Sequence, residues 1–463
     1  MNLKIKDIIK CTKGILLTGN EEVECENFSN DTRNIIEGDT FIALKGENSD
    51  GNLFWEDALK KGADTIITNK IEIDKKVLEK YKAKNIIQVD DTKIALGQIA
   101  TAKRNLYKDL IVIGVTGSVG KTSTKDIIAN VLSQRYKTLK TQGNYNNDIG
   151  LPLTILNLRD HEVAVIEMGM NHLGEISKLT KIAKPSISVI TNVGTSHIGN
   201  LGSRENILKA KLEIIEGMEV PLVVINNDND MLNKWAKENN DTVNIRTFGI
   251  ENKSECTPEN IIKRENSSSF TCCCESDKFN IEVPVGGDVF ILNALCGALV
   301  GKMLNLTNEE IQNGISSFEL TKKRMEIIKL ENDITLINDS YNASFDSMKA
   351  AIEYLSNTNA KRKIAVLGDM FELGDFSEEL HRKVGEEVAK NKIDLLFAIG
   401  KDAQFIIKEA ENKGMKKENI YYFNQRQELL EYIKNIMQEG DIILFKASNG
   451  MKLFEFVQEL KNN

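Results

Sequence analysis

The stretch 110–126, LIVIGVTGSVGKTSTKD, constrains the fold of this chain more than any other part of its sequence. Its apolar, β-branched start at 110–115 has the length of a buried strand, and a glycine-rich turn follows it. Lys121 and Thr122 then stand where a helix begins. Glycines let backbone N–H groups close around an anion, the helix N-terminus contributes its dipole, and a lysine adds positive charge. The pattern predicts a strand, a phosphate-binding loop and a helix, and hence an ATP site.

The loop departs from the strict P-loop consensus at its first glycine. That consensus places glycine at position 115, where this chain has Val115, and Gly114 stands one residue early. An ordinary glycine turn is the alternative interpretation, but a Lys-Thr pair at this point serves no packing purpose. Thr122 is also expected to hold Mg²⁺, and the loop residues predicted to bind ATP are Thr116, Gly117, Ser118, Val119, Gly120, Lys121, Thr122 and Ser123.

The length of 463 residues is too great for one hydrophobic core and indicates about three domains of roughly 150 residues each. After the phosphate loop, helical stretches alternate with further apolar strand candidates at 163–166, 187–191 and 222–225. Such alternation predicts a parallel sheet with helices on both faces. The polar segment 252–280 that follows is expected to be an irregular embellishment.

Strand candidates at 334–337, 364–367, 395–399, 420–423 and 442–445 again alternate with helical stretches, which predicts a Rossmann-like unit. Near the N-terminus, a helix expected over 53–61 lies between strands expected at 40–44 and 64–68. The predicted fold class is therefore α/β with three domains: a mixed α/β N-terminal domain over 1–108, a central P-loop-type parallel-sheet ATPase domain over 109–326, and a C-terminal Rossmann-like domain over 327–463.

The composition argues against several classes of protein. The net charge is −8 and no basic cluster with interleaved aromatic residues occurs, so nucleic acid is not the expected partner. No run approaches the roughly 20 apolar residues of a membrane span. The N-terminus has no uninterrupted apolar segment typical of a signal peptide. The seven cysteines show no C-x-x-C spacing, so reduced thiols and a cytoplasmic location are expected.

Polar residues follow the central strand candidates, at the sheet edge where parallel sheets bind ligands. Glu167 comes directly after the strand at 163–166, and Asn192 and His197 follow the strand at 187–191. Alone, a glutamate or histidine at a strand end is more often an ordinary hydrogen-bonding residue. Their shared edge with the phosphate loop favours a site that offers oxygen and nitrogen ligands to Mg²⁺.

Lys211 occupies an unusual place in the helix expected over 204–216. At 100° per residue it falls inside an apolar arc made by Ile207, Leu208, Leu212, Ile214 and Ile215. Such a lysine must snorkel, pair, or lose its proton. The residues alone favour a snorkelling side chain; the alternative is a neutral amine that reacts with CO₂ to give a carbamate able to bind Mg²⁺.

Two polar loops offer candidate substrate contacts. The loop 141–150 carries Asn144, Asn146 and Asn147, whose amides suit sugar hydroxyls, although a simple asparagine-rich turn fits equally well. In the N-terminal unit, Thr32-Arg33 and a glycine loop with Lys45 could hold a diphosphate or a sugar. A solvated loop is the equal alternative there.

Taken together, these segments resemble the Mur ligase family, ATP-dependent amide-forming enzymes of bacterial cell-wall synthesis. The resemblance covers essentially the whole chain. The motifs that carry it are DTR at 31–33, GVTGSVGKTSTK at 114–125, NYNNDIGLP at 144–152, EMGMNHLGEI at 167–176, TNVGTSH at 191–197, GSRENI at 202–207, RME at 324–326, NDSYNAS at 338–344 and LGDMFELG at 367–374.

Within the family, the runs at 338–344 and 367–374 resemble the members that add D-alanyl-D-alanine to UDP-N-acetylmuramoyl-tripeptide. The DNPR sequence of the sibling that adds the third amino acid is absent. The resemblance implies an acyl phosphate mechanism, ATP and two Mg²⁺ ions as cofactors, and those two small-molecule substrates. A monomer is expected, and the third domain is expected to close over the second because water must be kept from the acyl phosphate. The resemblance is compatible with meso-diaminopimelate or lysine as the third residue of the tripeptide.

The resemblance also implies roles for individual residues. Lys211 matches a carbamylated lysine, and Glu167 and His197 match metal ligands beside Thr122. The implied catalytic residues are Lys121, Lys211 and His197. Further ATP contacts are implied at Asn293, Arg324 and Asp339, and substrate contacts at Thr32, Arg33, Lys45, Asn144, Asn146, Asn147, Ser203 and Asn342.

Some positions depart from the family pattern. Asp288-Val289 stands where relatives usually have His-Asn, Phe345 replaces a frequent proline, and 446–449 reads KASN in place of KGSR. Other functions kept open are the sibling ligase, a folylpolyglutamate-type ligase, and a nucleotide-gated binding protein without ligase chemistry.

Overall fold

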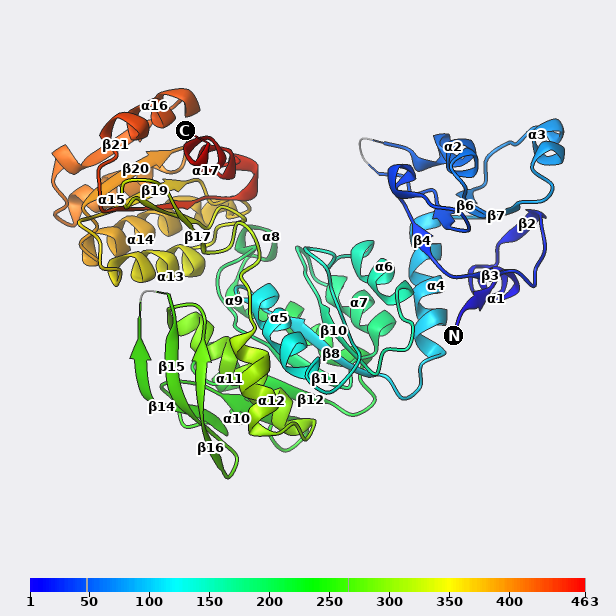
Figure 1. Ribbon diagram of the computed structural model, residues 1–463, viewed down its shortest axis with the longest axis horizontal. Helices are drawn as coiled ribbons and strands as arrows, with labels where there is room; N and C mark the ends of the chain where they lie inside the picture. Colours follow the sequence, from blue (N-terminus) through cyan, green and yellow to red (C-terminus); the bar gives the residue numbers. More distant parts are fainter. Residues whose placement is uncertain (47–48, 265, 463) are drawn as a thin grey trace.

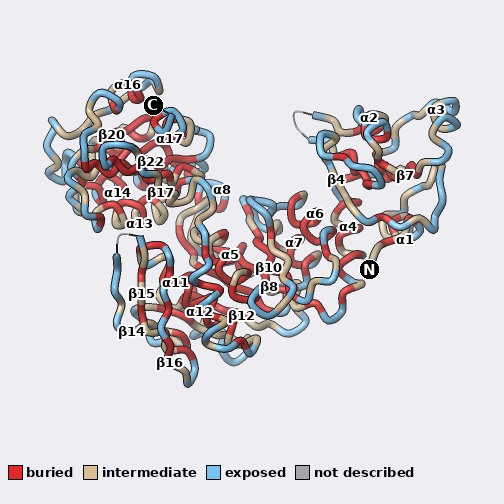
Figure 2. The backbone as a smooth tube through the Cα atoms, in the orientation of Figure 1, coloured by how far each residue is buried: buried red, intermediate tan, exposed pale blue. Residues whose placement is uncertain are grey.

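Three large sheets, each covered by helices, divide the described chain into three bodies, and a two-stranded sheet of β1 and β3 lies in the first of them (Figure 1). The computed structural model describes residues 1–46, 49–264 and 266–462. The N-terminal body, in blue, and the C-terminal body, in orange and red, rise from opposite ends of the central one. Figure 2 shows that buried residues gather within each body, so each has its own hydrophobic interior.

The N-terminal body contains a five-stranded sheet in the order β2-β7-β6-β5-β4, in which only β2 runs antiparallel to its neighbour. Its strands are β1 (Leu3–Lys4), β2 (Ile15–Thr18), β3 (Glu24–Cys25), β4 (Phe28–Ser29), β5 (Thr40–Ile42), β6 (Thr65–Asn69) and β7 (Asn85–Val89). Its helices are α1 (Ile5–Thr12), α2 (Trp55–Lys60), α3 (Lys75–Lys80) and α4 (Thr92–Asn105).

The central body contains a nine-stranded sheet in the order β16-β15-β14-β13-β12-β11-β8-β10-β9. Strand β8, which leads into the phosphate loop, lies between β11 and β10 and is parallel to both. The strands are β8 (Ile111–Thr116), β9 (Thr138–Lys140), β10 (Val163–Glu167), β11 (Ile187–Ile190), β12 (Leu222–Asn226), β13 (Asn244–Phe248), β14 (Cys256–Lys263), β15 (Ser268–Cys274) and β16 (Asp277–Val283).

Eight α-helices of the described chain surround this sheet. They are α5 (Lys121–Leu132), α6 (Gly150–Leu156), α7 (Glu175–Ala183), α8 (Ile198–Leu201), α9 (Arg204–Leu212), α10 (Asp230–Asn239), α11 (Asp288–Met303) and α12 (Asn308–Ser316). The helix expected over 204–216 becomes a 3₁₀ turn at Glu213–Gly217.

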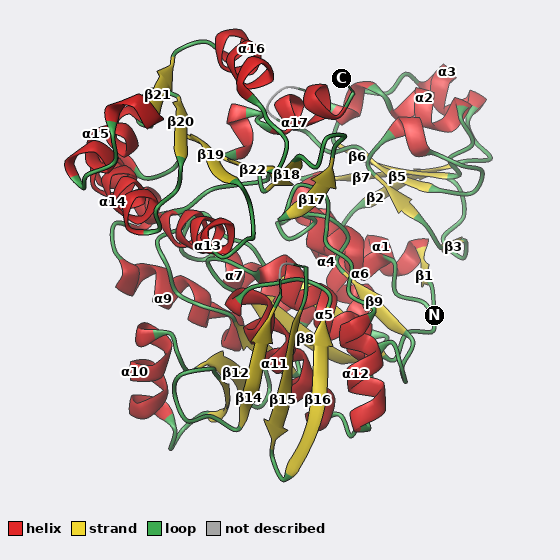
Figure 3. Ribbon diagram, turned by 60° about the vertical axis from the view of Figure 1, so that its left-hand side comes forward, coloured by secondary structure: helices red, strands yellow, loops and turns green. Residues whose placement is uncertain are grey.

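The prediction that 252–280 is irregular is wrong. Strands β14, β15 and β16 form an antiparallel extension of the central sheet, seen at the front of Figure 3. Burial alternates along β15, where Ser268, Phe270, Cys272 and Cys274 are buried and the residues between them are not. The strand pattern is therefore present, but the buried positions carry serine and cysteine, which hid it among polar residues.

The C-terminal body contains a six-stranded sheet in the order β17-β18-β22-β19-β20-β21, parallel except for β17. Its strands are β17 (Glu326–Lys329), β18 (Thr335–Asn338), β19 (Arg362–Gly368), β20 (Leu395–Ile399), β21 (Ile420–Phe423) and β22 (Asp441–Lys446). Its helices are α13 (Phe345–Ser356), α14 (Ser377–Lys390), α15 (Gln404–Asn412), α16 (Arg426–Ile436) and α17 (Phe454–Lys461).

The predicted α/β architecture with three domains is confirmed, and every strand candidate of the central and C-terminal units exists to within about two residues, the usual uncertainty of assigned ends. The exact boundaries 1–108, 109–326 and 327–463 stay predictions. Among the described residues, no helix is both long enough and apolar enough to cross a membrane.

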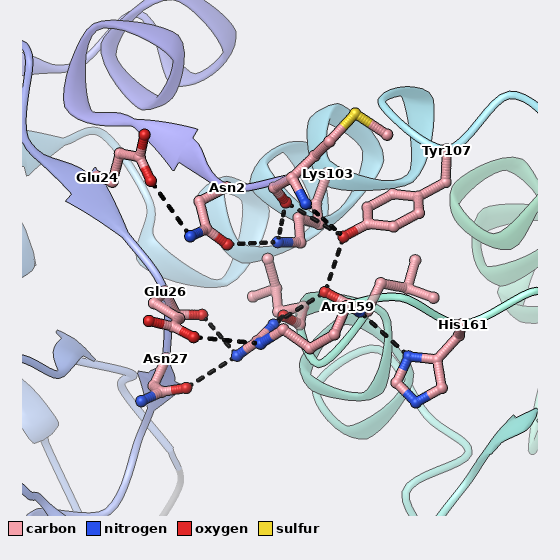
Figure 4. A network of polar contacts seen from close by, with 11 residues as sticks. Asn2, Glu24, Glu26, Asn27, Lys103, Tyr107, Arg159 and His161 are labelled. Carbon is pink, nitrogen blue, oxygen red and sulfur yellow. Dashed lines mark hydrogen bonds and ion pairs between the residues drawn. The ribbon is translucent and has the colours of Figure 1, made fainter. Parts of the chain in front are cut away.

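Polar contacts join the N-terminal body to the central one (Figure 4). Arg159 donates to the backbone oxygen of Glu26 at 2.9 Å and to Oδ1 of Asn27 at 2.8 Å. The hydroxyl of Tyr107 donates to the backbone oxygen of Leu158 at 3.0 Å. Lys103 is fully buried in this network, and burial lowers its pKa to about 8.

Candidate functional site

The phosphate loop between β8 and α5 is shaped by two glycines. A Cβ at Gly117 would lie 1.9 Å from the hydroxyl oxygen of Thr191, so only glycine fits there. Gly120 has φ +82° and ends the loop at the helix N-terminus, a backbone conformation that side chains disfavour. Lys121 Nζ lies above the loop and donates to the backbone oxygen of Gly117 at 2.8 Å. The loop thus has the backbone and the charge of a phosphate cradle.

The departure from the P-loop consensus has a structural reason. Val115 is fully buried within β8, before the loop begins. Gly114 also lies in the strand, where an added Cβ would approach Pro185, Ile214 and Met168 within 3.3 Å. Gly114 is therefore tightly packed in the strand, and the loop conformation depends on the two glycines that follow.

Glu167 ends β10 directly beside the phosphate loop. Its side chain is buried, and Oε2 accepts a hydrogen bond of 2.9 Å from the Thr122 hydroxyl. Oε1 accepts a 2.7 Å hydrogen bond from Nδ2 of Asn146. The backbone N–H of Glu167 donates to the hydroxyl of Thr141 at 3.0 Å. A buried carboxylate and a hydroxyl at the first turn of α5 form an oxygen-rich donor set of the kind that Mg²⁺ prefers.

A cleft of about 1170 Å³ opens in front of the loop, between the central and C-terminal bodies. It brings together thirteen of the predicted site residues: Ser118, Val119, Gly120, Lys121, Thr122, Ser123, Asn146, Asn147, Glu167, His197, Arg324, Asp339 and Asn342. An adjoining cavity of about 300 Å³ is lined by Val119, Gly120 and Asn293, among others. Sequence positions more than 200 residues apart therefore meet in one space, as the sheet-edge argument predicted.

Several predicted residues lie outside both cavities: Thr116, Gly117, Lys211, Thr32, Arg33, Lys45, Asn144 and Ser203. Thr116 and Gly117 form the wall behind the loop, and the Ser203 hydroxyl caps the N-terminus of α9 by accepting from the backbone N–H of Asn206. Asn144 accepts from the backbone N–H of Asn146 at 2.7 Å through its own backbone oxygen.

Lys211 lies on the buried face of α9, with 2% of its surface exposed. It does not snorkel. Burial lowers its pKa well below the ordinary value, and the positive charge of Lys121 lowers it further. No hydrogen bond or ion pair of its amine is found within the described parts of the chain. The structure therefore holds an amine near the phosphate loop that favours its neutral, nucleophilic form.

His197 stands at the start of α8 with φ +63° and faces the C-terminal body. Its Nδ1 lies 2.5 Å from Oε2 of Glu372. The hydrogen bond from His197 lowers the pKa of Glu372, so this residue is a carboxylate at neutral pH. A carboxylate that orients one ring nitrogen directs the other toward a ligand, the usual arrangement around metal-binding histidines.

Comparisons with known proteins identify the family. Mur ligase domain models match over 26–104 (family catalytic domain), 115–301 (middle domain) and 323–449 (glutamate ligase domain). The UDP-N-acetylmuramoyl-tripeptide–D-alanyl-D-alanine ligase of Bacillus subtilis is 38% identical over 459 residues, or 98% of each chain. The chain belongs to the Mur ligase family. The predicted resemblance is confirmed.

Solved structures of the family share the architecture of this Mur ligase. MurF from Acinetobacter baumannii superposes with a TM-score of 0.89 at 28% identity, over 100% of this chain and 99% of that one. The MurF ligase of Thermotoga maritima in complex with ADP gives a TM-score of 0.81 at 28% identity, over 94% and 97%. The three-domain fold is thus common to these proteins and to this Mur ligase.

Residues in and directly before the C-terminal body of this Mur ligase add charged groups to the cleft. The guanidinium of Arg324 stacks on the Tyr341 ring at 3.9 Å. Asp339 Oδ2 pairs with Nζ of the buried Lys446 at 2.5 Å, and Lys446 also donates to the backbone oxygen of Asn342 at 3.1 Å. In the sequence, Lys446 is marked only by the departure from the family pattern at 446–449. Its contact with Asp339 depends on the pairing of β18 with β22 in the sheet, which the local sequence does not show.

Two buried polar atoms at the cleft and its side cavity have no hydrogen-bond partner within the described chain. They are Nε of Arg324 and Nδ2 of Asn293, whose Oδ1 accepts from Thr124 at 2.9 Å. Buried donors are normally satisfied, so each has a capacity that a ligand can fill. Both residues were predicted to contact ATP.

The N-terminal candidates are separate from the cleft. Arg33 is 84% exposed, and its guanidinium forms a two-point contact with Asp31, which lowers the pKa of Asp31 to about 2. Lys45 is exposed and pairs with Asp50 through a backbone bridge, while Glu47 and Asn48 of the same loop lie outside the described residues.

Proposed function

We propose that this Mur ligase joins D-alanyl-D-alanine to the peptide carboxylate of UDP-N-acetylmuramoyl-tripeptide, with conversion of ATP to ADP and phosphate, in peptidoglycan precursor synthesis. The observation that carries the proposal is the cleft in which a phosphate loop, a buried Glu167 and Arg324, which precedes the C-terminal sheet, meet. The full-length similarity to ligases of that name supports the choice of substrates.

Activation of the acid explains why such a site needs ATP. A carboxylate is a poor acyl donor at neutral pH. Its attack on the γ-phosphorus of ATP forms an acyl phosphate and releases ADP; the amine of the dipeptide then attacks the acyl carbon, phosphate leaves, and the amine loses a proton. Loop N–H groups, Lys121 and Arg324 are placed to stabilise the charge on the transferred phosphoryl group. Closure of the C-terminal domain would exclude water from the acyl phosphate.

Magnesium fits the donor set at the loop. Thr122 and Glu167 would hold the ion, whose chemistry is to neutralise phosphate charge and orient the γ-phosphoryl group. No three acidic, cysteine or histidine side chains of the described residues form a metal site by themselves. Proteins usually hold Mg²⁺ with one or two carboxylates together with substrate phosphates.

A second ion would be held by His197 and a carbamate on Lys211. The neutral amine of Lys211 would attack the carbon of CO₂ and release a proton, which gives an anionic oxygen ligand. Burial of Lys211 in an apolar helix face supports this proposal because it keeps the amine unprotonated.

Labelled CO₂ provides a test of the carbamate. In ¹³C-bicarbonate buffer, we expect a carbamate signal that is absent from Lys211→Ala. Removal of CO₂ should lower ligase activity at least about tenfold, and bicarbonate should restore it, because an anionic ligand in a buried site is lost and regained. Lys209→Ala, an exposed lysine of the same helix, is the matched control and should keep both properties. An unlabelled wild-type protein that is fully active without CO₂ would contradict the proposal.

The domains divide the substrates. We assign the UDP-sugar to the domain 1–108 with Thr32, Arg33 and Lys45, ATP to 109–326, and the dipeptide to 327–463. Asn144, Asn146, Asn147, Ser203 and Asn342 would contact the peptide part. The chain would act as a monomer, which light scattering can check, and in the cytoplasm, where UDP-linked precursors and ATP are available.

A substrate screen tests the activity directly. Purified protein with ATP, Mg²⁺ and UDP-N-acetylmuramoyl-tripeptide, carrying either meso-diaminopimelate or lysine, is offered D-alanyl-D-alanine, single amino acids or glutamate. We expect a new mass, larger than the tripeptide substrate by the dipeptide less one water, only with D-alanyl-D-alanine. A product with glutamate or one amino acid would assign a different ligase activity, and nucleotide binding without any product would reject ligase chemistry.

A further inference from the structure

A carboxylate of the C-terminal body forms hydrogen bonds with a loop of the central body. Asp346, the second residue of α13, accepts two hydrogen bonds at Oδ2: from the backbone N–H of Thr195 at 2.7 Å and from the Thr195 hydroxyl at 2.8 Å. A Cβ at Gly194 would lie 2.3 Å from the same oxygen. This close contact requires glycine at 194, and together with the two hydrogen bonds it fixes the position of the Asp346 carboxylate.

The loop that contains Thr195, residues 192–197, also forms hydrogen bonds with the phosphate loop. Oδ1 of Asn192 accepts from the backbone N–H groups of Ser118 and Val119 at 3.1 and 2.9 Å. The backbone N–H of Gly194 donates to the Ser118 hydroxyl at 2.9 Å. Asn192 and Gly194, which precede Thr195 in the same loop, therefore form hydrogen bonds with the phosphate loop itself.

The far end of the loop meets the same C-terminal body a second time. His197 contacts Glu372, and the backbone N–H of Gly199 donates to the backbone oxygen of Glu372 at 3.0 Å. Within the central body, Arg204 holds the near end, because its Nη2 donates to the backbone oxygen of Val193 at 2.8 Å. The loop is thus fixed by the central body at one end and by the C-terminal body at Thr195 and His197.

We propose that Asp346 is a positioning residue that couples the docking of the C-terminal domain on the central domain to the conformation of the phosphate loop. The coupling acts through Thr195 and the loop 192–197. The inference rests on the proposed function, because it concerns the same ATP site. Asp346 makes no step of the reaction itself. It makes phosphoryl transfer efficient only when the C-terminal domain, which carries Lys446, is docked on the central domain.

The test separates coupling from nucleotide binding and from folding. For Asp346→Ala and Thr195→Val we expect kcat to fall about tenfold or more, as misplacement of a catalytic loop does. The affinity for ADP should change less than about twofold, because loop contacts to the nucleotide remain in the central body. Thr195→Ser, which keeps the hydroxyl, should stay close to wild type.

The double variant gives the strongest evidence. If Asp346 acts through Thr195, Asp346→Ala combined with Thr195→Val should lose no more kcat than Asp346→Ala alone, because Asp346→Ala already removes both hydrogen bonds. Additive losses, an unchanged kcat in Asp346→Ala, or an equal loss of ADP affinity and kcat would each overturn the proposal.

Hydrogen exchange keeps this test distinct from that of the ligase activity. In Asp346→Ala we expect faster amide exchange at 116–122 and 192–197, in a different domain from the substitution, with unchanged protection of β18 and β22. Exchange that rises only around α13, or throughout the C-terminal sheet, would contradict coupling. This readout requires no turnover, so a wild-type protein that fails the substrate screen leaves it interpretable.

Discussion

At the scale of single residues, burial lowers the pKa of several basic side chains. His381 is a clear case outside the cleft. Its side chain is fully buried, Nε2 accepts from the backbone N–H of Met370 at 3.0 Å, and Nδ1 bonds to the backbone oxygen of Ser377 at 2.7 Å. Burial lowers the pKa of His381 below its ordinary value of 6.5. The folded protein therefore keeps this ring neutral.

The stability of the fold should depend on pH through His381. Below about pH 6.5 the unfolded chain binds a proton that the folded chain does not, so this contribution to stability is present above that pH and is lost as pH falls. We expect urea unfolding of the wild type to lose up to about 1.4 kcal/mol for each pH unit from this group. His381→Gln should show a shallower decline between pH 7.5 and 5.5.

The exposed His172 supplies the control for this experiment. His172→Gln should follow the wild-type pH dependence, since it removes an exposed ring and leaves His381 and its hydrogen bonds in place. Identical pH slopes for the wild type and His381→Gln would show that His381 takes up a proton without loss of stability.

At the scale of elements, the phosphate loop depends on close contact between Gly117 and β11. In Gly117→Ala the new methyl group would collide with Thr191, 1.9 Å away, and the loop must shift. We expect ADP affinity, measured by calorimetry, to fall at least about tenfold, because aligned N–H groups lose their geometry. Gly414→Ala is the matched control: φ is +96° and no atom lies within 4 Å of the added Cβ. It should lower stability slightly and leave ADP affinity unchanged, and equal affinities in both variants would contradict this account.

The helices and strands also show which parts of the fold could be predicted from the sequence. The parallel strands were predicted well because each is a short apolar run buried on both faces. The strands β14–β16 were missed because their buried positions include Ser268, Cys272 and Cys274, which a hydrophobicity pattern does not distinguish from an exposed loop. Helical periodicity placed Lys211 inside an apolar arc but favoured a snorkelling side chain, and its burial depended on what packs against α9.

At the scale of the whole molecule, interfaces between bodies decide which substrates can be held together. The N-terminal body is tied to the central one by Arg159, whose two hydrogen bonds to Glu26 and Asn27 cross the interface (Figure 4). Arg159→Ala should raise the KM for UDP-N-acetylmuramoyl-tripeptide by roughly tenfold, since each lost hydrogen bond is worth about 0.5–1.5 kcal/mol. The affinity for ADP should be unchanged because the phosphate loop is untouched.

Arg135→Ala is a suitable control, because Arg135 forms its ion pair with Glu310 inside the central body. It should leave the KM for the UDP-linked substrate as in the wild type. A parallel rise in KM for both variants, or a fall in ADP affinity in Arg159→Ala, would refute a role for this interface in substrate placement.

The sequence by itself determined the local parts of this protein. The phosphate loop, its helix and Glu167 at the end of β10 follow from contiguous residues, because backbone geometry and strand burial are set within about ten positions. Tertiary structure alone decided the pairs His197–Glu372, Thr195–Asp346 and Asp339–Lys446, which are 175, 151 and 107 residues apart. Hydrogen bonds between such distant residues are set by sheet order and by the seating of one domain on another, and both are properties of the packed chain.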